Sequence, residues 1–140
     1  SLHDALPIFN GVPYYNDSKA TNPDSTIKAL EAFDGHIILL AGGHDKMTSL
    51  EPMMKLVQAK ADVLILLGEA KERFYEAAAA AGVGDIRKVE TMDEAVELAY
   101  KLAAAPQVVL LSPACSSYDM FENFPARGRY FKNLVAALPK

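Results

Sequence analysis

The sequence has a single cysteine, no tryptophan and no long run of apolar side chains. Because Cys115 has no second cysteine to pair with, an internal disulfide is excluded, which fits a reducing compartment. The longest runs without a polar side chain, Ile37 to Gly43 and Ala77 to Gly84, are far shorter than the roughly 20 residues that cross a membrane. Residues 1–10 lack the basic start and apolar core of a secretory signal peptide. We therefore expect a cytoplasmic protein that has no membrane partner.

Neither sign of charge is in large excess. The chain has 14 Lys and Arg residues against 18 Asp and Glu residues, a formal net charge of −4, and no cluster of basic side chains. Such a balance gives a nucleic-acid backbone little to bind, so we expect no nucleic-acid partner. What the chain does have is 140 residues that are 51% hydrophobic and 23% charged. This is typical of one globular domain that buries about two-thirds of its unfolded surface, and we expect a monomer.

Short apolar runs supply the strands. Three runs, Ile37 to Leu40, Val63 to Leu67 and Val108 to Leu111, show no alternation with polar residues. Unbroken runs of this length are typical of strands buried on both faces, as in a parallel sheet. Weaker strands are expected at Val12 to Tyr15 and at Ile86 to Val89.

Segments with helical spacing alternate with these strands. Start signals are Asn22-Pro23, before a helix that ends near Gly35, and the capping pairs Thr48 with Glu51 and Thr91 with Glu94. Gly82 is a stop signal after a helix over about Glu69 to Ala81. A last helix carries Tyr130, Leu134 and Leu138 on one face. The alternation predicts an α/β fold, a Rossmann-like doubly wound, mostly parallel sheet with helices on both faces.

Polar loops follow three of the predicted strands. They span residues 16–22 (Asn-Asp-Ser-Lys-Ala-Thr-Asn), residues 42–46 (Gly-Gly-His-Asp-Lys) and residues 112–119 (Ser-Pro-Ala-Cys-Ser-Ser-Tyr-Asp). Ligands of open parallel sheets bind beyond the carboxyl ends of the strands, so all three loops should open on one edge. Glycines allow close approach of backbone N–H groups, and Lys46 adds a compact positive charge. The edge therefore suits a carboxylate or a phosphate.

Several of these residues have a second interpretation. Asn22 and Thr48 are expected to be helix caps rather than ligand contacts. Thr21 and Asp17 each suit either a ligand contact or a local turn, and the Gly42-Gly43 pair suits either close ligand approach or simple strand-end turn chemistry.

Nucleophilic and metal chemistry receive little support. Cys115 is expected to be a small packed residue rather than a nucleophile, since no histidine lies near it in sequence. His3, His36 and His44 lack metal-ligand spacing with one another or with Cys115, so we expect no metal site.

The same three loops carry a resemblance to a known family. The run from Asn16 to Asn22, the run from Gly42 to Lys46 and the run from Leu111 to Phe121, with Asn123-Phe124 and Arg127-Gly128, resemble the C-terminal domain of the Mur ligases, in particular those that add D-glutamate. The resemblance covers about residues 11 to 138 in consistent order.

The resemblance implies a function and a set of roles. Mur ligases form an acyl phosphate from a substrate carboxylate and ATP, with Mg²⁺ balancing phosphate charge, and an amino acid then attacks it. The implied substrates are D-glutamate, ATP and UDP-N-acetylmuramoyl-L-alanine. The positions implied to bind D-glutamate are Thr21, Lys46, Ser117 and Phe124, and those implied on the nucleotide side are Asp17, Ser18, Lys19 and Arg127. None of the residues is implied to be catalytic or to hold a metal.

The resemblance also sets an expected boundary. Residues 1–9 do not resemble the family, and we interpret them as a truncation scar or a sequence artefact that precedes a domain over residues 10–140. The phosphate loop and metal carboxylates of the family lie in a central domain, so we expect this chain alone to be inactive and to bind no cofactor. Two other functions stay open: a stand-alone module that binds a small anion, and a nucleotide-dependent oxidoreductase, which the missing G-x-G-x-x-G motif disfavours.

Overall fold

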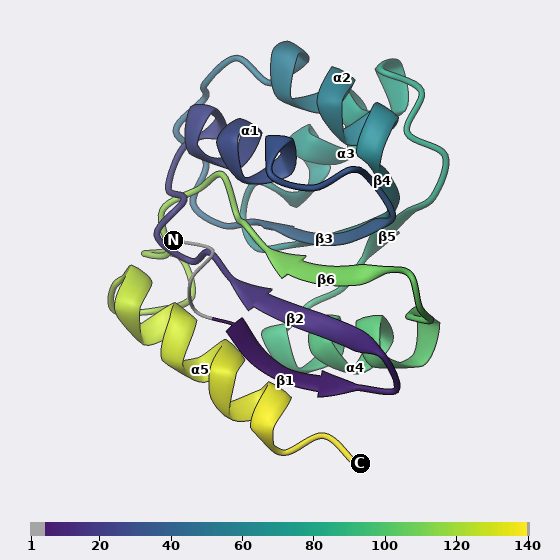
Figure 1. Ribbon diagram of the computed structural model, residues 1–140. Helices are drawn as coiled ribbons and strands as arrows, with labels where there is room; N and C mark the ends of the chain where they lie inside the picture. Colours follow the sequence, from purple (N-terminus) through teal and green to yellow (C-terminus); the bar gives the residue numbers. More distant parts are fainter. Residues whose placement is uncertain (1–4, 140) are drawn as a thin grey trace.

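The computed structural model describes residues 5–139, which build a six-stranded sheet between two layers of helices (Figure 1). The strands are β1 (Ala5–Phe9), β2 (Val12–Asn16), β3 (Ile37–Gly42), β4 (Ala61–Leu67), β5 (Ile86–Lys88) and β6 (Val108–Leu111). The helices are α1 (Pro23–Glu31), α2 (Glu51–Lys60), α3 (Lys71–Ala80), α4 (Met92–Leu102) and α5 (Phe124–Ala136). The strand order is β1-β2-β6-β3-β4-β5, with β1 antiparallel to β2 and every other pair parallel. The predicted doubly wound, mostly parallel sheet is confirmed.

Burial on both faces explains the unbroken apolar runs. In β3, Ile37 and Leu39 pack with α1, α2 and α3, whereas Ile38 and Leu40 pack with α4 and α5. Figure 1 shows the same division, with α1 to α3 above the sheet and α4 and α5 below it. Because neither face of β3 meets water, polar residues have no place in the strand.

The helix caps are partly as predicted. Asn22 caps α1 by accepting from the Ser25 N–H, and Thr91 forms a capping box with Glu94 at α4. The prediction that Thr48 caps α2 is wrong, because the residue before the helix is Leu50 and it makes no side-chain cap. The chain around Thr48 is instead held from outside by Arg73, which donates to the Thr48 carbonyl.

The third helix is shorter than predicted. It begins at Lys71 rather than near Glu69, while Gly82 follows its end with φ 85° as a stop signal requires. The two residues before it are used elsewhere: the Glu69 N–H donates to Asp119, and the Ala70 N–H donates to the Gly43 carbonyl. Contacts with neighbouring loops thus outweigh helical propensity at this end.

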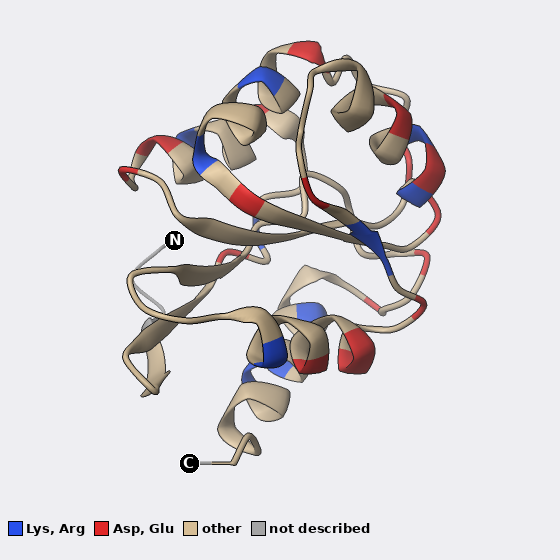
Figure 2. Ribbon diagram, turned by 90° about the vertical axis from the view of Figure 1, so that its right-hand side faces the viewer, with Lys and Arg blue, Asp and Glu red and all other residues tan. Residues whose placement is uncertain are grey.

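The segment predicted to precede the domain is described in part. Residues 1–4, which include His3, lie outside the described residues, and residues 5–9 pair with β2 as the edge strand β1. The boundary at residue 10 stays a prediction. Basic and acidic positions are interspersed over helices and strand ends (Figure 2). Within residues 5–139, none of the helices has the length and apolar character needed to cross a bilayer.

Candidate functional site

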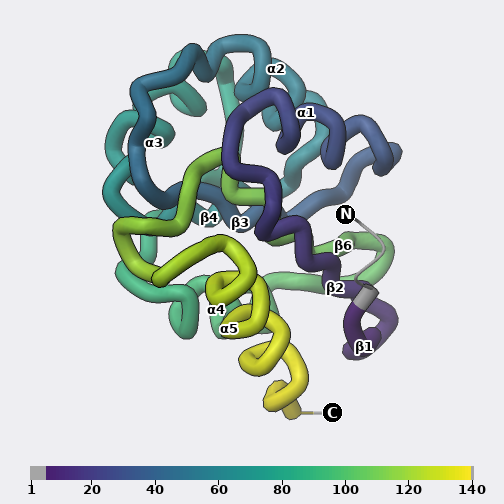
Figure 3. Tube along the Cα trace, turned by 90° about the vertical axis from the view of Figure 1, so that its left-hand side faces the viewer, coloured from purple at the N-terminus to yellow at the C-terminus, as the bar shows by residue number. Residues whose placement is uncertain are grey.

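The carboxyl ends of β2, β3 and β6 meet at one edge of the sheet, the edge that faces the viewer in Figure 3. Backbone hydrogen bonds join the loops that leave this edge. The Asp17 N–H donates to the Leu111 carbonyl at 2.7 Å, and the His44 N–H donates to the Ser116 carbonyl at 3.0 Å. The prediction that the polar loops open on one edge is confirmed.

Lys46 and Thr21 meet across two of these loops. The Lys46 side chain is exposed, and its Nζ donates to the Thr21 carbonyl at 3.3 Å. Thr21 is half-buried and comes directly before the helix cap Asn22, so its own hydroxyl is not needed to cap α1. A primary ammonium and a threonine hydroxyl therefore lie at the start of a helix, where anions are favoured.

Asp17 lies at the end of β2 and is 6% exposed. Ser112, which is fully buried, donates its hydroxyl to Asp17 Oδ2 at 2.9 Å, and Thr26 Oγ1 lies 3.0 Å from the same hydroxyl. Burial raises the pKa of Asp17 above its ordinary value, and the Ser112 hydrogen bond acts in the opposite direction. The Asp17 side chain is thus fixed by a long-range partner, beyond the local turn considered from sequence.

Ser117 lies in the loop after β6 and is 2% exposed. Within residues 5–139, the Oγ atoms of Ser116 and Ser117 are buried without a hydrogen-bond partner, as is Asp119 Oδ1. Buried polar atoms are nearly always paired, so this loop holds hydroxyl groups that are suited to bind a further group. The Ser117 Oγ is covered in this structure, and a ligand reaches it only if the loop shifts.

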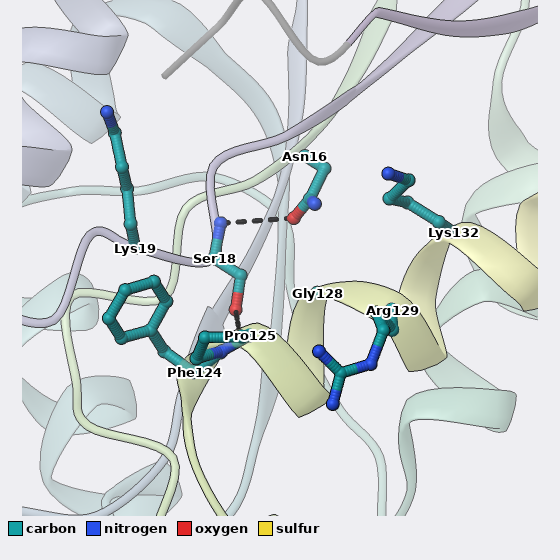
Figure 4. Close-up of a pocket in the computed structure, with 8 residues that line it drawn as sticks. All are labelled: Asn16, Ser18, Lys19, Phe124, Pro125, Gly128, Arg129 and Lys132. Atoms are coloured by element: carbon teal, nitrogen blue, oxygen red, sulfur yellow. Dashed lines mark hydrogen bonds between the residues drawn. The ribbon is translucent and has the colours of Figure 1, made fainter.

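Phe124 and Ser18 connect α5 to the loop after β2. Phe124 is the first residue of α5 and is 42% exposed, and its carbonyl accepts from the Ser18 hydroxyl at 2.8 Å. An open pocket of about 240 Å³ lies beside this contact, with Lys19 and Phe124 on one side of Ser18 and Arg129 and Lys132 on the other (Figure 4). Ser18 itself is buried, whereas Lys19 is exposed.

Arg127 is buried and joins two of the loops. It is 3% exposed, its Nε and Nη2 donate to the hydroxyl and carbonyl of Ser18 at 2.9 and 2.6 Å, and its Nη1 donates to the Cys115 carbonyl at 2.9 Å. Burial lowers the pKa of Arg127 to about 10. The guanidinium therefore supports the loops from within, a role that sequence reasoning did not include.

Cys115 and the paired glycines have structural explanations. Cys115 is 2% exposed, and burial raises the pKa of its thiol to about 12, so the interpretation as a packed residue is confirmed. A Cβ on Gly42 would lie 2.0 Å from the Leu67 carbonyl oxygen, and one on Gly43 would lie 2.6 Å from the Ser116 carbonyl oxygen. Each glycine thus fills a place where the chain's own backbone comes too close for a side chain.

The ion pair between Arg73 and Asp45 is a contact that sequence reasoning missed. It comes from α3, and its guanidinium binds the Asp45 carboxylate through Nε and Nη2, each at 2.8 Å. The hydrogen bond from Arg73 lowers the pKa of Asp45 below its ordinary value. The two residues are 28 positions apart and belong to different elements, so no spacing rule could have paired them. Among the described residues, no group of three or more His, Cys, Asp or Glu side chains could hold a metal ion.

Comparison with known proteins shows the family of the chain. The family model described as "Mur ligase, glutamate ligase domain" matches residues 5–115. The UDP-N-acetylmuramoylalanine--D-glutamate ligase of Citrifermentans bemidjiense is 48% identical over 91% of this chain and 28% of its own length. The ligase of the same name from Clostridioides difficile is 44% identical over 96% of this chain and 33% of its own length. The chain thus spans about a third or less of the length of these relatives.

A solved structure shows the same fold. The murein peptide ligase of Psychrobacter arcticus superposes with a TM-score of 0.65 over 97% of this chain and 30% of its own. At 10% sequence identity this likeness concerns the fold alone.

Proposed function

The chain belongs to the Mur ligase family as its glutamate ligase domain, and from this premise we propose that it supplies the amino-acid pocket of a cytoplasmic, ATP-dependent ligase that adds D-glutamate to UDP-N-acetylmuramoyl-L-alanine. The observation that carries the proposal is the meeting of Lys46 and Thr21 at the carboxyl edge, 3.3 Å from Nζ to carbonyl oxygen. Ser117 follows Ser116, whose carbonyl accepts a hydrogen bond from the N–H of His44 in the loop that carries Lys46. The names of the curated relatives support D-glutamate as the amino acid.

The chemistry of D-glutamate fits these side chains. At neutral pH it carries two carboxylates beside one ammonium group, and the two carboxylates call for a cation and hydroxyl donors. Lys46 supplies the charge, and the hydroxyls of Thr21 and Ser117 supply donors. Each charge-assisted hydrogen bond contributes about 1.5–3 kcal/mol. Because the Ser117 Oγ is covered, binding of D-glutamate by this hydroxyl requires the loop after β6 to shift. The half-exposed Phe124 is proposed to border the same pocket.

The nucleotide side is proposed at the end of β2. Asp17, Ser18 and Lys19 lie in sequence there, and Lys19 and Ser18 line the open pocket next to α5. Lys19 suits a phosphate or another anion, whereas Arg127 acts through Ser18 because its guanidinium is buried. ATP brings the phosphoryl group that activates the carboxylate of UDP-N-acetylmuramoyl-L-alanine. The residues described here do not fit Mg²⁺, since residues 5–139 hold no cluster of metal ligands, and no step is assigned to it.

Replacement of Lys46 tests the amino-acid pocket. In the ligase that carries this chain, Lys46→Ala should raise the KM for D-glutamate at least about tenfold, which corresponds to about 1.4 kcal/mol, and leave the KM for ATP nearly unchanged. The matched control is Lys101→Ala, which removes an exposed lysine that pairs with Glu97 within α4. An unchanged KM for D-glutamate in Lys46→Ala would overturn the assignment.

A further inference from the structure

The loop between β3 and α2 is held at two points by one side chain. Arg73 of α3 binds both oxygens of Asp45 at 2.8 Å, and its Nη1 donates to the Thr48 carbonyl at 2.9 Å. The side chains of Arg73 and Asp45 are 29% and 14% exposed, so the pair is only partly exposed to water. Its planar fork fixes distance and direction together, which a single charge does not.

Lys46 and Met47 lie between the two points that Arg73 holds. Met47 has φ 58°, in the left-handed region that a side chain with a Cβ rarely adopts. Its N–H donates to Asp45 Oδ1 at 2.8 Å, so the carboxylate that binds Arg73 also closes this turn. The Asp45 N–H in turn donates to Glu69 Oε1 at 3.0 Å. Such a conformation persists only where several contacts impose it.

The position of the Lys46 backbone matters because the side chain that it carries is long and flexible. The ammonium sits at the end of four methylene groups and donates a hydrogen bond to the Thr21 carbonyl. A backbone displacement of about 1 Å at Lys46 would have to be taken up by the side-chain torsions, which misaligns the ammonium toward a bound carboxylate and weakens the hydrogen bond.

We propose that Arg73 is a positioning residue for amino-acid binding, which acts by clamping Asp45 and Thr48 so that Lys46 presents its ammonium at the carboxyl edge. This inference rests on the proposed function, because it takes Lys46 to be the cation of the D-glutamate pocket. Arg73 is not among the residues proposed to bind either ligand. Its effect therefore passes through Lys46 and falls on D-glutamate rather than on ATP.

A double-mutant cycle in the ligase that carries this chain tests the inference. Arg73→Gln should raise the KM for D-glutamate about fivefold, with less than about a twofold change in the KM for ATP. In the Lys46→Ala background, Arg73→Gln should raise the KM by less than about 1.5-fold, because the residue through which it acts is gone. Arg73→Lys should recover only part of the loss, since one ammonium cannot reproduce the fork.

The chain offers a matched control. Arg87 binds Asp85 through Nε and Nη2 at 2.6 and 3.3 Å, on β5 and apart from the Lys46 loop. Arg87→Gln should leave both KM values unchanged. If Arg73→Gln lowers the melting temperature too far for assay, Asp45→Asn breaks the same clamp with an isosteric side chain and should give the same pattern.

The outcomes separate the two claims. A raised KM in Lys46→Ala together with an unchanged KM in both Arg73→Gln and Asp45→Asn overturns the positioning role and leaves the proposed function standing. An equal effect of Arg73→Gln with and without Lys46 also overturns it, because the residue would then act independently of Lys46. An unchanged KM in Lys46→Ala overturns the proposed function and the inference with it.

Discussion

Arg127 and Arg73 both fasten loops of the carboxyl edge, but they do so in opposite surroundings. Arg127 is 3% exposed, and its partners are two backbone carbonyls and a hydroxyl, all neutral. The Arg73 side chain is 29% exposed and has a carboxylate partner. Burial lowers the pKa of Arg127 to about 10, whereas the hydrogen bond to Asp45 raises the pKa of Arg73. Arg127 thus serves as a rigid set of donors, and Arg73 as one half of an ion pair.

The largest effect should come from removing the buried donors. Arg127→Met keeps most of the volume but leaves the carbonyls of Ser18 and Cys115 without donors, so the free energy of unfolding should fall by about 3 kcal/mol. Urea unfolding of the 140-residue chain measures the change. Arg129→Met, two positions along α5 on an exposed side chain, should change it by less than about 0.5 kcal/mol. Equal losses in the two variants would show that the hydrogen bonds of Arg127 contribute no more to the free energy of unfolding than an exposed side chain does.

A smaller loss should follow from crowding the same place. A Cβ on Gly43 would lie 2.6 Å from the Ser116 carbonyl oxygen and 3.4 Å from Arg127 Nη1, at a residue with φ 145°. Gly43→Ala should therefore destabilise the chain by about 2 kcal/mol. Gly84→Ala is the control, because nothing lies within 4 Å of its Cβ. A wild-type unfolding midpoint in Gly43→Ala would mean that the two loops can separate at little cost.

Removing the ion pair should cost less than either change. Arg73→Gln should lower the free energy of unfolding by about 1 kcal/mol at low salt, since partly exposed pairs contribute little. Its deficit should shrink in 1 M NaCl, where charges are screened, while that of Arg127→Met, whose hydrogen-bond partners are neutral, should not. Urea unfolding at both salt concentrations measures this. If the loss in the free energy of unfolding for Arg73→Gln is the same at both salt concentrations, the contrast between the two arginines is removed.

The smallest effect is a dependence on pH. Because the pKa of Asp45 is lowered in the folded chain, chiefly by Arg73, its stabilising contribution is complete above the unfolded value near 3.8 and is lost as the pH falls through the folded value. Asp45→Asn should therefore be less stable than wild type at pH 7, by less than about 1 kcal/mol, and the difference should shrink as the pH falls below the unfolded value near 3.8. Thermal melts across this range measure it, and a gap that persists in acid would point to packing.

Much of the fold could be predicted from the sequence, because local signals set it. The unbroken run from Ile37 to Leu40 requires cover on both faces, and the caps Asn22 and Thr91 act within their own first turns. Parallel strands then bring the three polar loops to one edge. The Thr48 cap failed because a residue on another helix takes hold of that part of the chain.

The support of the site could not be predicted in the same way. Arg127 and Ser18 are 109 positions apart, and Arg73 and Asp45 are 28 apart, so only the folded chain brings them together. The burial of the Ser117 hydroxyl has the same origin, since it depends on how the loop after β6 settles over the edge. The roles of Lys46, Thr21, Ser117 and Phe124 toward D-glutamate stay predictions.

The contact between Lys46 and Thr21 carries a consequence for selectivity. In this structure the ammonium already has an uncharged acceptor, the Thr21 carbonyl. An incoming carboxamide would offer it another uncharged oxygen and so gain little from the exchange, whereas a carboxylate adds an opposite charge. If Lys46 binds the side-chain carboxylate, as proposed, this internal hydrogen bond favours glutamate over glutamine.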